Sequence, residues 1–176
     1  MIIDKTMTLV KYGSAAFDPK QFKPVTRHNY LQCKPDGGMW ACPVDSEYGW
    51  KHWCEGERFS ADLDVSFTFT YEGRYIVIDK LADLDDLTWT IPEELKGLHG
   101  FCGCEYIDFA NSLAKGIDAV HLTVEGQNRT RHTFPRNLYG WDCESVLILN
   151  PNKVIQIPDD VAPTRRLPTR RFNFTQ

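Results

Sequence analysis

The sequence lacks the features that would place the protein in a membrane or in a secretory pathway. No stretch of the 176 residues approaches the ~20 apolar residues that a membrane-spanning helix needs. The apolar stretch at the N-terminus is interrupted by Asp4 and Lys5, whereas a signal peptide has an unbroken apolar segment there. The net charge of −4 gives no bulk attraction to nucleic acid or to an anionic membrane. We therefore expect a cytoplasmic protein with no membrane partner.

Common catalytic and metal-binding motifs are missing as well. The sequence contains no Walker loop, no G-x-S-x-G nucleophile turn and no H-E-x-x-H pair. Its six cysteines include no C-x-x-C pair, and Cys102 and Cys104 are closer together than the usual zinc knuckle allows. We therefore expect free thiols in a reducing cytosol, with a zinc site as the alternative.

Enough apolar residues are present for a stable folded chain. Hydrophobic residues make up 42% of the sequence and charged residues 25%, an ordinary globular balance. A chain of this length can bury roughly 70% of the surface of its unfolded state. We expect one domain over residues 1–158, followed by a proline-containing basic tail at 159–176. The four arginines of this tail could contact a nucleic acid or a partner protein.

The apolar pattern predicts more strands than helices. Helices are expected at 46–58 and 106–114, and strands at 7–12, 39–42, 65–70, 74–79, 117–123, 145–149 and 154–157. Glu72 and Gly73 are expected to form a turn, and residues 17–37 and 124–139 to be loops. The connections are too short for repeated βαβ units. The predicted fold is therefore α+β, with a mixed or antiparallel sheet and a few flanking helices.

The first candidate cluster runs from Lys34 to Pro43 and contains the double glycine at 37–38 and the apolar run at 39–42. Glycines can adopt positive φ and let the backbone approach a ligand closely. Trp40, which follows them, could then stack on a flat ring. A tight turn leading to a core tryptophan would explain the same residues.

The second candidate cluster is formed by Asp142 and Glu144. Residues two apart in an extended segment point to the same face. Two carboxylates held together attract a cationic group, such as an oxocarbenium-like transition state. The aromatic residues at 139 and 141 favour a lined cleft. The alternative is a pair of solvated acids beside a buried strand.

The third candidate group lies at Gln127, Arg129, Arg131 and His132. Arg129 and Arg131 could bind a diphosphate through bidentate hydrogen bonds. A charged surface loop is the alternative explanation. Among the other histidines, His28 and His121 are the ones that could assist a proton transfer.

Three segments, taken in order, resemble the core of the ADP-ribosyltransferases. Val10-Lys11-Tyr12-Gly13-Ser14 is similar to the strand in which this family has a His or Arg before a glycine. Gly38-Met39-Trp40-Ala41-Cys42-Pro43 is similar to its second strand, and Asp142-Cys143-Glu144-Ser145 to the strand entered through a glutamate. Tyr12 stands in the place of His or Arg, Cys42 in that of Ser, and Asp142 in that of the first Gln or Glu.

The resemblance covers about residues 8–157 and implies an ADP-ribosyltransferase-like fold with NAD as a substrate. Glu144 would stabilise the ribosyl cation, and Asp142 would help to select the acceptor, an unknown protein or nucleic acid. The resemblance implies that Tyr12 is catalytic together with Glu144 and Asp142. The implied NAD-binding residues are Gly13, Ser14, Gly38, Trp40, Cys42, Tyr48, Arg129 and Arg131. Tyr12, Trp40 and Glu144 are therefore expected to face one shared hollow.

Other interpretations remain open at this point. The whole chain also resembles small uncharacterised proteins encoded in phage and bacterial genomes, and a phage-encoded protein would act in the host cytoplasm. A non-catalytic module of this kind could use the same aromatic residues as anchors for a partner protein. A metal-dependent hydrolase or nuclease would need Asp142 and Glu144 to converge with a third carboxylate on an ion.

Overall fold

A computed structural model describes residues 1–25, 27–29, 34–99 and 103–158, with the backbone alone at 27–29. The predicted tail at 159–176 lies outside the described residues, as do Cys33, Cys102 and the side chain of His28. The fold is mixed, with one main sheet and few helices, as the apolar pattern predicts. Within the described ranges, no helix has both the length and the apolar character needed to cross a membrane.

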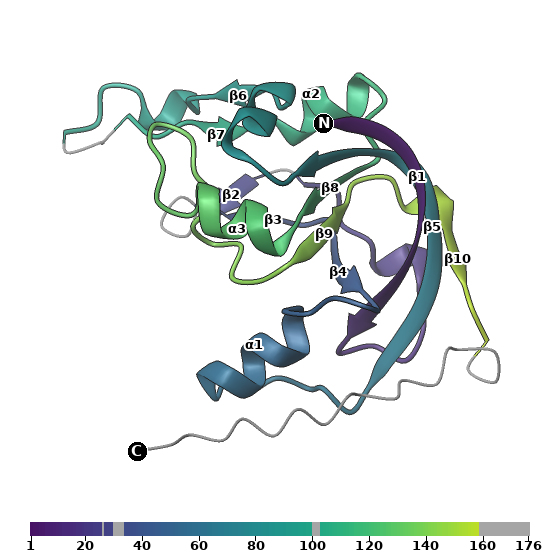
Figure 1. The fold of residues 1–176 in the computed structure, drawn as a ribbon. Coiled ribbons are helices and arrows are strands. Elements are labelled where there is room, and N and C mark those ends of the chain that lie inside the picture. The colour runs from purple at the N-terminus through teal and green to yellow at the C-terminus, as the bar shows by residue number, and fades with distance from the viewer. Residues whose placement is uncertain (26, 30–33, 100–102, 159–176) are drawn as a thin grey trace, which may run out of the picture.

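The main sheet contains a closed ring of strand pairings. In ring order the strands are β1 (Ile2–Tyr12), β4 (Met39–Pro43), β9 (Ser145–Ile148), β8 (Ala119–Leu122) and β5 (Ser66–Ile78). All pairings in the ring are antiparallel except that between β5 and β8. The short strand β10 (Val154–Gln156) pairs with the free edge of the first half of β5. Figure 1 shows β1, β5 and β10 side by side along one flank of the molecule.

Apolar side chains cover both faces of this sheet. Residues from all five ring strands contact one another in one cluster, which therefore fills the inside of the ring: Met7, Leu9, Met39, Ala41, Phe67, Phe69, Tyr71, Tyr75, Ala119, Val146 and Ile148. On the outer face, a second cluster joins β5, β8 and β9 to the segments that cover them: Ile76, Ile78, Leu84, Leu87, Ile107, Phe109, Ile117, Val120, Leu122, Leu138, Trp141, Leu147 and Leu149. Two apolar layers thus hold the sheet from both sides.

The remaining elements are short. The helices are α1 (Trp50–Glu57), α2 (Phe109–Ala114) and α3 (Val124–Thr130), and 3-10 turns lie at Pro19–Gln21, Leu81–Asp86, Glu93–Leu95 and Pro151–Lys153. Two small antiparallel pairs join β2 (Arg27–Asn29) to β3 (Lys34–Asp36) and β6 (Trp89–Thr90) to β7 (Tyr106–Ile107). In Figure 1, β6, β7 and α2 lie together on one side of the ring, and α1 lies on the opposite side.

The predicted turn at Glu72 and Gly73 is wrong, because β5 runs without a break from Ser66 to Ile78. Gly73 pairs with Lys5 inside the ladder between β1 and β5. A Cβ atom on Gly73 would lie 2.9 Å from the Tyr71 ring and 3.0 Å from the Asp118 Cβ. The glycine is therefore needed for close packing beneath the strand and does not mark a chain reversal.

Three further local predictions need correction. Residues 124–130 form α3 where a loop was expected, because the Thr123 hydroxyl accepts a hydrogen bond from the Gly126 N–H and caps the helix. Helix α1 begins at Trp50, four residues later than predicted from Ser46, with Gly49 as its N-cap residue. The region expected to be an irregular loop at 17–37 contains β2, β3 and one 3-10 turn.

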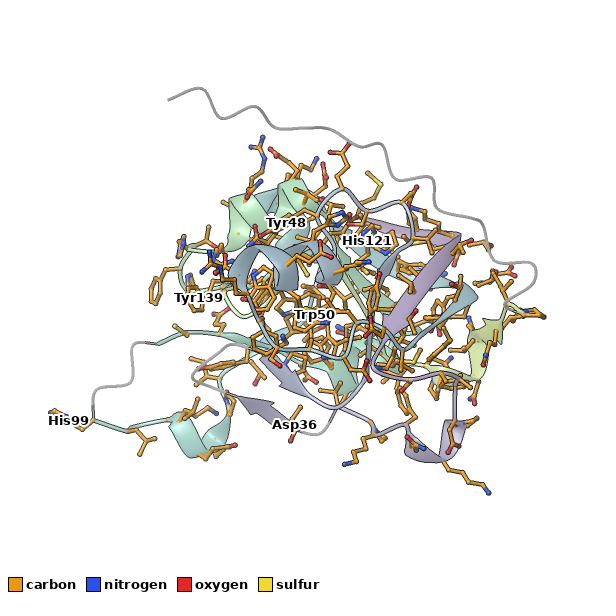
Figure 2. All side chains as sticks on the ribbon, turned by 90° about the horizontal axis from the view of Figure 1, so that it is seen from below. Asp36, Tyr48, Trp50, His99, His121 and Tyr139 are labelled. Atoms are coloured by element: carbon orange, nitrogen blue, oxygen red, sulfur yellow. The ribbon has the colours of Figure 1, made fainter. Side chains whose placement is uncertain are left out.

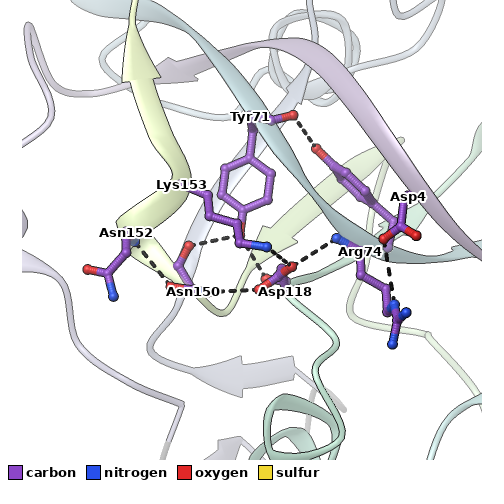
Figure 3. A network of polar contacts seen from close by, with 8 residues as sticks. Asp4, Tyr71, Arg74, Asp118, Asn150, Asn152 and Lys153 are labelled. Atoms are coloured by element: carbon purple, nitrogen blue, oxygen red, sulfur yellow. Dashed lines mark hydrogen bonds and ion pairs between the residues drawn. The ribbon is translucent and has the colours of Figure 1, made fainter.

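A buried carboxylate ties three segments of the chain together (Figure 3). Asp118, before β8, accepts hydrogen bonds from the Arg74 N–H at 2.9 Å, from Asn150 Nδ2 at 2.8 Å and from Lys153 Nζ at 2.7 Å. Burial alone raises the pKa of Asp118, but these donors outweigh it and hold the pKa below its ordinary value. The carboxylate therefore fixes the segment after β9 against β5.

The approach of α3 to the ring leads to a stability prediction. A Cβ atom on Gly126 would lie 2.0 Å from the carbonyl oxygen of Ile78, a backbone atom of β5. We expect Gly126→Ala to lower the free energy of unfolding by about 1–3 kcal/mol, because the helix must move away from the strand. Urea denaturation followed by circular dichroism measures this change.

A second helical glycine provides the matched control. Nothing lies within 4 Å of the Cβ position at Gly56 in α1. Gly56→Ala should therefore raise the free energy of unfolding by about 0.5–1 kcal/mol, the ordinary gain in helix propensity. Equal losses of stability in the two variants would contradict the close approach of Gly126 to β5.

Candidate functional site

The ends of three neighbouring strands meet around one cavity of about 260 Å³. Val10, Lys11 and Tyr12 line it from β1, and Trp40, Ala41 and Cys42 line it from β4. Asp142, Cys143 and Ser145 line it from the segment that enters β9, and Lys34 and Trp50 complete the wall. This convergence follows from the ring order, because β4 lies between β1 and β9. The three segments that resemble the ADP-ribosyltransferase core therefore lie next to one another.

Indole rings form the apolar part of this cavity. Trp40 packs edge-on against the fully buried Trp141, with ring centroids 4.6 Å apart. Trp50, on α1, stacks on Trp53 at 5.1 Å, and both rings pack against Phe59. Each cavity-facing indole is thus held in place by a second indole behind it. Such a fixed ring offers a flat face to a planar ligand at little cost in side-chain entropy.

Charged groups surround Asp142 at the edge of the cavity. Its carboxylate lies 3.8 Å from Lys34 Nζ and 3.9 Å from an Arg131 guanidinium nitrogen. Both distances exceed the 2.7–2.9 Å typical of a charge-assisted hydrogen bond. Lys34 also lies 5.1 Å from the centre of the Trp40 ring, and Arg131 lies over Tyr139 at 5.1 Å. The carboxylate and the two cations can therefore exchange partners when a charged ligand enters.

Lys11 is a further cation in this wall. Its ammonium group donates a hydrogen bond to the carbonyl oxygen of Tyr12 at 3.0 Å. Burial lowers the pKa of Lys11, because the desolvated ammonium is less stable than a hydrated one. The sequence prediction passed over Lys11, although a lysine between Val10 and Tyr12 at the end of an apolar strand was a signal for it. Lys34 opens the first predicted cluster but was given no role in it, and Trp50 was missed because only the folded chain brings it to β4.

The thiols in the wall are unsuited to nucleophilic attack. Burial raises the pKa of Cys143 to about 12, and a hydrogen bond with Ser145 offsets only part of this increase. Cys42 is 3% exposed, and its sulfur faces the carbonyl oxygen of Val10. A buried thiol with a raised pKa stays protonated at neutral pH and is a poor nucleophile. Cys143 is therefore a surface for a ligand to pack against.

Glu144 lies outside this cavity. Its carboxylate is 2.9 Å from Nε2 of the buried His121, and the residue lines a separate open hollow with Asp45, Ser46, Glu47, Asp79, Thr123, Val124 and Glu125. The expectation that Asp142 and Glu144 share a face is wrong, because β9 begins only at Ser145 and the preceding residues bend. Strict alternation holds inside a paired strand and not in such a segment. Tyr12 and Trp40 thus share one cavity with Asp142 in place of Glu144.

The other predicted ligand-binding residues are divided among several places. Ser14 and Gly38 line a second hollow that adjoins the cavity. The Gly13 N–H donates to the carbonyl oxygen of Val65 at 2.8 Å, so this donor is already used. Arg129 is exposed and pairs with Glu125 at 2.6 Å, away from Asp142. The diphosphate site expected at Arg129 and Arg131 therefore retains Arg131 alone.

Tyr48 lies near the rim. Burial, followed by the Glu57 carboxylate, raises the pKa of its hydroxyl, and the charges of Arg131 and Asp142 act on it as well. Figure 2 shows Tyr48 and Trp50 near α1, whereas His99 lies far away at the edge of the molecule. Tyr48 is 38% exposed, so it can flank a ligand at the entrance but does not line the cavity.

The double glycine has a structural explanation. A Cβ atom on Gly37 would lie 2.4 Å from the carbonyl oxygen of Pro24, and one on Gly38 would lie 2.5 Å from the Leu147 side chain. Both residues have positive φ, and the Gly38 N–H donates to the carbonyl oxygen of Lys23. The close backbone approach predicted here is therefore made to the chain itself, although Gly38 also borders the second hollow.

Comparison with known protein families, with curated proteins and with solved structures finds no match for this chain. In the part of the chain that the structure describes, no group of three or more His, Cys, Asp or Glu residues is arranged to hold a metal ion.

The pair formed by His121 and Glu144 leads to a prediction about acid stability. Burial raises the pKa of Glu144, but the hydrogen bond with His121 and the nearby Ser46 hydroxyl outweigh it, so the pKa lies below its ordinary value. The hydrogen bond between His121 and the ionised carboxylate therefore stabilises the fold at neutral pH, and this contribution is lost as the pH falls through the lowered pKa of Glu144.

We expect Glu144→Gln to lower the free energy of unfolding at pH 7 by about 1 kcal/mol, since an amide replaces a charged acceptor. The difference from the wild type should shrink as the pH falls below ~4.5, where the unfolded wild-type chain takes up a proton at Glu144, and it should vanish below the lowered pKa of the folded state. Urea denaturation at a series of pH values measures both effects. A difference that stays constant down to pH 2 would show that ionised Glu144 contributes nothing.

Proposed function

We propose that the cavity binds NAD and that the protein transfers the ADP-ribosyl group of NAD to an acceptor. The observation that carries this proposal is the meeting of β1, β4 and β9 around Trp40 and Asp142. The cavity offers a flat aromatic wall, a carboxylate, and two cations, Lys34 and Arg131, that can exchange partners. Together these groups suit a ligand that combines a planar ring, a sugar and phosphates.

Different residues bind the nicotinamide ring and the phosphates. The face of Trp40 packs on the nicotinamide ring, and Tyr12 borders the same space from β1. Lys34 and Arg131 move from Asp142 to the phosphates, which bind a guanidinium group through paired hydrogen bonds. This exchange leaves the Asp142 carboxylate facing the ribose with its negative charge uncompensated.

Asp142 then stabilises the transition state. The bond between C1′ of the ribose and the nicotinamide nitrogen breaks, its electron pair leaves with neutral nicotinamide, and positive charge develops on the ribosyl group. A carboxylate fixed beside this charge lowers the barrier more than it stabilises the ground state. The acceptor nucleophile bonds to C1′ and loses its proton. In this scheme Asp142 takes the role that the resemblance assigned to Glu144.

The test compares two neighbouring carboxylates. Asp142→Asn should lower the rate of nicotinamide release from NAD about 100-fold or more, because it removes the charge that faces the ribosyl cation. Trp40→Ala should weaken NAD binding about ten-fold, since the stacking face is lost. Chromatographic detection of nicotinamide measures the first effect, and isothermal titration calorimetry measures the second.

Glu144→Gln is the matched control. It removes a carboxylate two residues away that faces His121 and not the cavity, so nicotinamide release should remain close to the wild-type rate. Loss of activity in Glu144→Gln with full activity in Asp142→Asn would overturn the assignment of Asp142. Absence of NAD binding by the wild-type protein would overturn the proposed function itself.

A protein-binding module is the second candidate function, and one observation favours it. The aromatic residues of α1 and its end form an outer group, in which Phe59 is 51% exposed and packs against Trp50 and Trp53. Partly exposed aromatic residues are frequent anchors of protein interfaces. This function requires no NAD affinity, so the calorimetric measurement separates the two candidates.

A further inference from the structure

A second hollow of about 270 Å³ adjoins the cavity and shares Lys11 and Trp40 with it. Its other walls come from the segment after β1 and from the start of β4. Phe17, Phe22 and Phe67 supply apolar surface, while Ser14, Asp18 and Gln21 supply polar groups. This composition, apolar walls with a few polar groups, is typical of a small-molecule site.

The two hollows meet because β1 and β4 separate. The ladder between these strands pairs Leu9 with Pro43 and Val10 with Cys42, and no pair follows. From Lys11 onward β1 continues to pair with β5, opposite Phe67 and Ser66. Lys11 and Trp40 therefore stand at the point where the strands part, with one hollow on either side.

The sizes of the hollows indicate one extended ligand. Small-molecule sites usually have volumes of about 300–1,000 Å³. The first hollow measures about 260 Å³ and the second about 270 Å³, so each lies just below this range. Their combined volume falls inside it, and the Lys11 and Trp40 that they share make them neighbours, here called the first and second lobe.

The segment that lines the second lobe is held in a defined shape. The Phe17 N–H donates to Gln156 Oε1 of β10 at 3.0 Å. Asp18 caps the 3-10 turn at Pro19–Gln21 by accepting from the Lys20 N–H at 2.9 Å, and it accepts a further hydrogen bond from Gln21 Nε2. Phe17 and Phe22 pack against the core inside the ring. The lobe is therefore preformed, which reduces the entropic cost of binding.

Lys11 lies where an anionic linker between two lobes would pass. An ammonium group has three donors, and one of them bonds the carbonyl oxygen of Tyr12. The others can serve a phosphate group between the lobes. Burial lowers the pKa of Lys11, and a neighbouring anion would favour its charged form again.

We propose that the second lobe, lined by Phe17, Phe22 and Phe67, is a subsite for a nucleobase, and that Lys11 binds the diphosphate linking it to the group in the first lobe. This inference rests on the proposed function, and it assigns the adenosine half of NAD to the second lobe. The base lies against the phenylalanine rings, and the polar groups of Asp18 and Gln21 are close enough to meet its sugar.

Calorimetric titrations with NAD, nicotinamide mononucleotide and ADP distinguish binding in the first lobe from binding in the second. Phe22→Ala should weaken the binding of NAD and of ADP about ten-fold, because one aromatic face of the base site is lost. Binding of nicotinamide mononucleotide should stay at the wild-type level and so also show that the variant is folded. Lys11→Gln should weaken NAD and ADP as well and should reduce the dependence of their affinity on salt.

Two further variants control for effects on packing. Phe22→Leu keeps an apolar side chain and removes the ring, so it should reproduce the loss of affinity without loss of stability. Leu81→Ala truncates an exposed apolar residue that lines neither lobe and should leave the affinity for all three ligands unchanged.

Each result has a distinct meaning. If NAD and nicotinamide mononucleotide bind and no change at Phe22 affects NAD, the second subsite is overturned while the proposed function stands. If ADP binds in a manner sensitive to Phe22 but nicotinamide mononucleotide does not bind, the subsite stands and the nicotinamide assignment is overturned. If the wild-type protein binds none of the three ligands, both proposals are overturned.

Discussion

The pairing of β1 with β5 is the constraint on which the rest of the structure depends. It extends over the whole of β1, from Ile2 to Tyr12, and it closes the ring that begins with β4, β9 and β8. β1 pairs with β5 to its end at Tyr12, whereas its pairing with β4 stops at Val10. The strands then separate, and side chains at the separation border open space on both sides. The cavity therefore opens where two ring strands separate, and Lys34, Trp50 and the segment before β9 complete its wall.

Much of this arrangement could be predicted from the sequence where local pattern and burial agree. The apolar runs before Tyr12, around Trp40 and after Ser145 predict strands, and all three are strands of the ring. The turn predicted at Gly73 was wrong, because a glycine after Glu72 is locally typical of a turn. A glycine is required at this position because a side chain there would contact Asp118. That residue is 45 positions away in the chain and lies against Gly73 only in the folded protein. Long-range packing of this kind has no local signal.

The residues of the candidate site also divide into those that could be predicted from the sequence and those that could not. Tyr12 and Trp40 could be assigned to one cavity because each lies near the end of a recognisable strand, whereas Asp142 occupies the place expected for Glu144. The part of Lys34 in the cavity wall could not be predicted, since it lies in a three-residue strand, and neither could that of Trp50, which starts a short helix. The direction of Glu144 was also unpredictable, because alternation requires a ladder and the ladder of β9 starts one residue later.

The two carboxylates at 142 and 144 differ in how firmly their partners hold them, and this difference supports the roles proposed for them. Glu144 bonds the 5% exposed His121 at 2.9 Å, and that ring cannot turn away without leaving buried groups unpaired. Asp142 has two cations at 3.8 and 3.9 Å, each about one third exposed and therefore partly hydrated. Such partners are given up at small cost, because loose, partly exposed ion pairs contribute little free energy. A carboxylate with replaceable partners can interact with a charge that appears only during a reaction, whereas one bound to a buried histidine holds the fold.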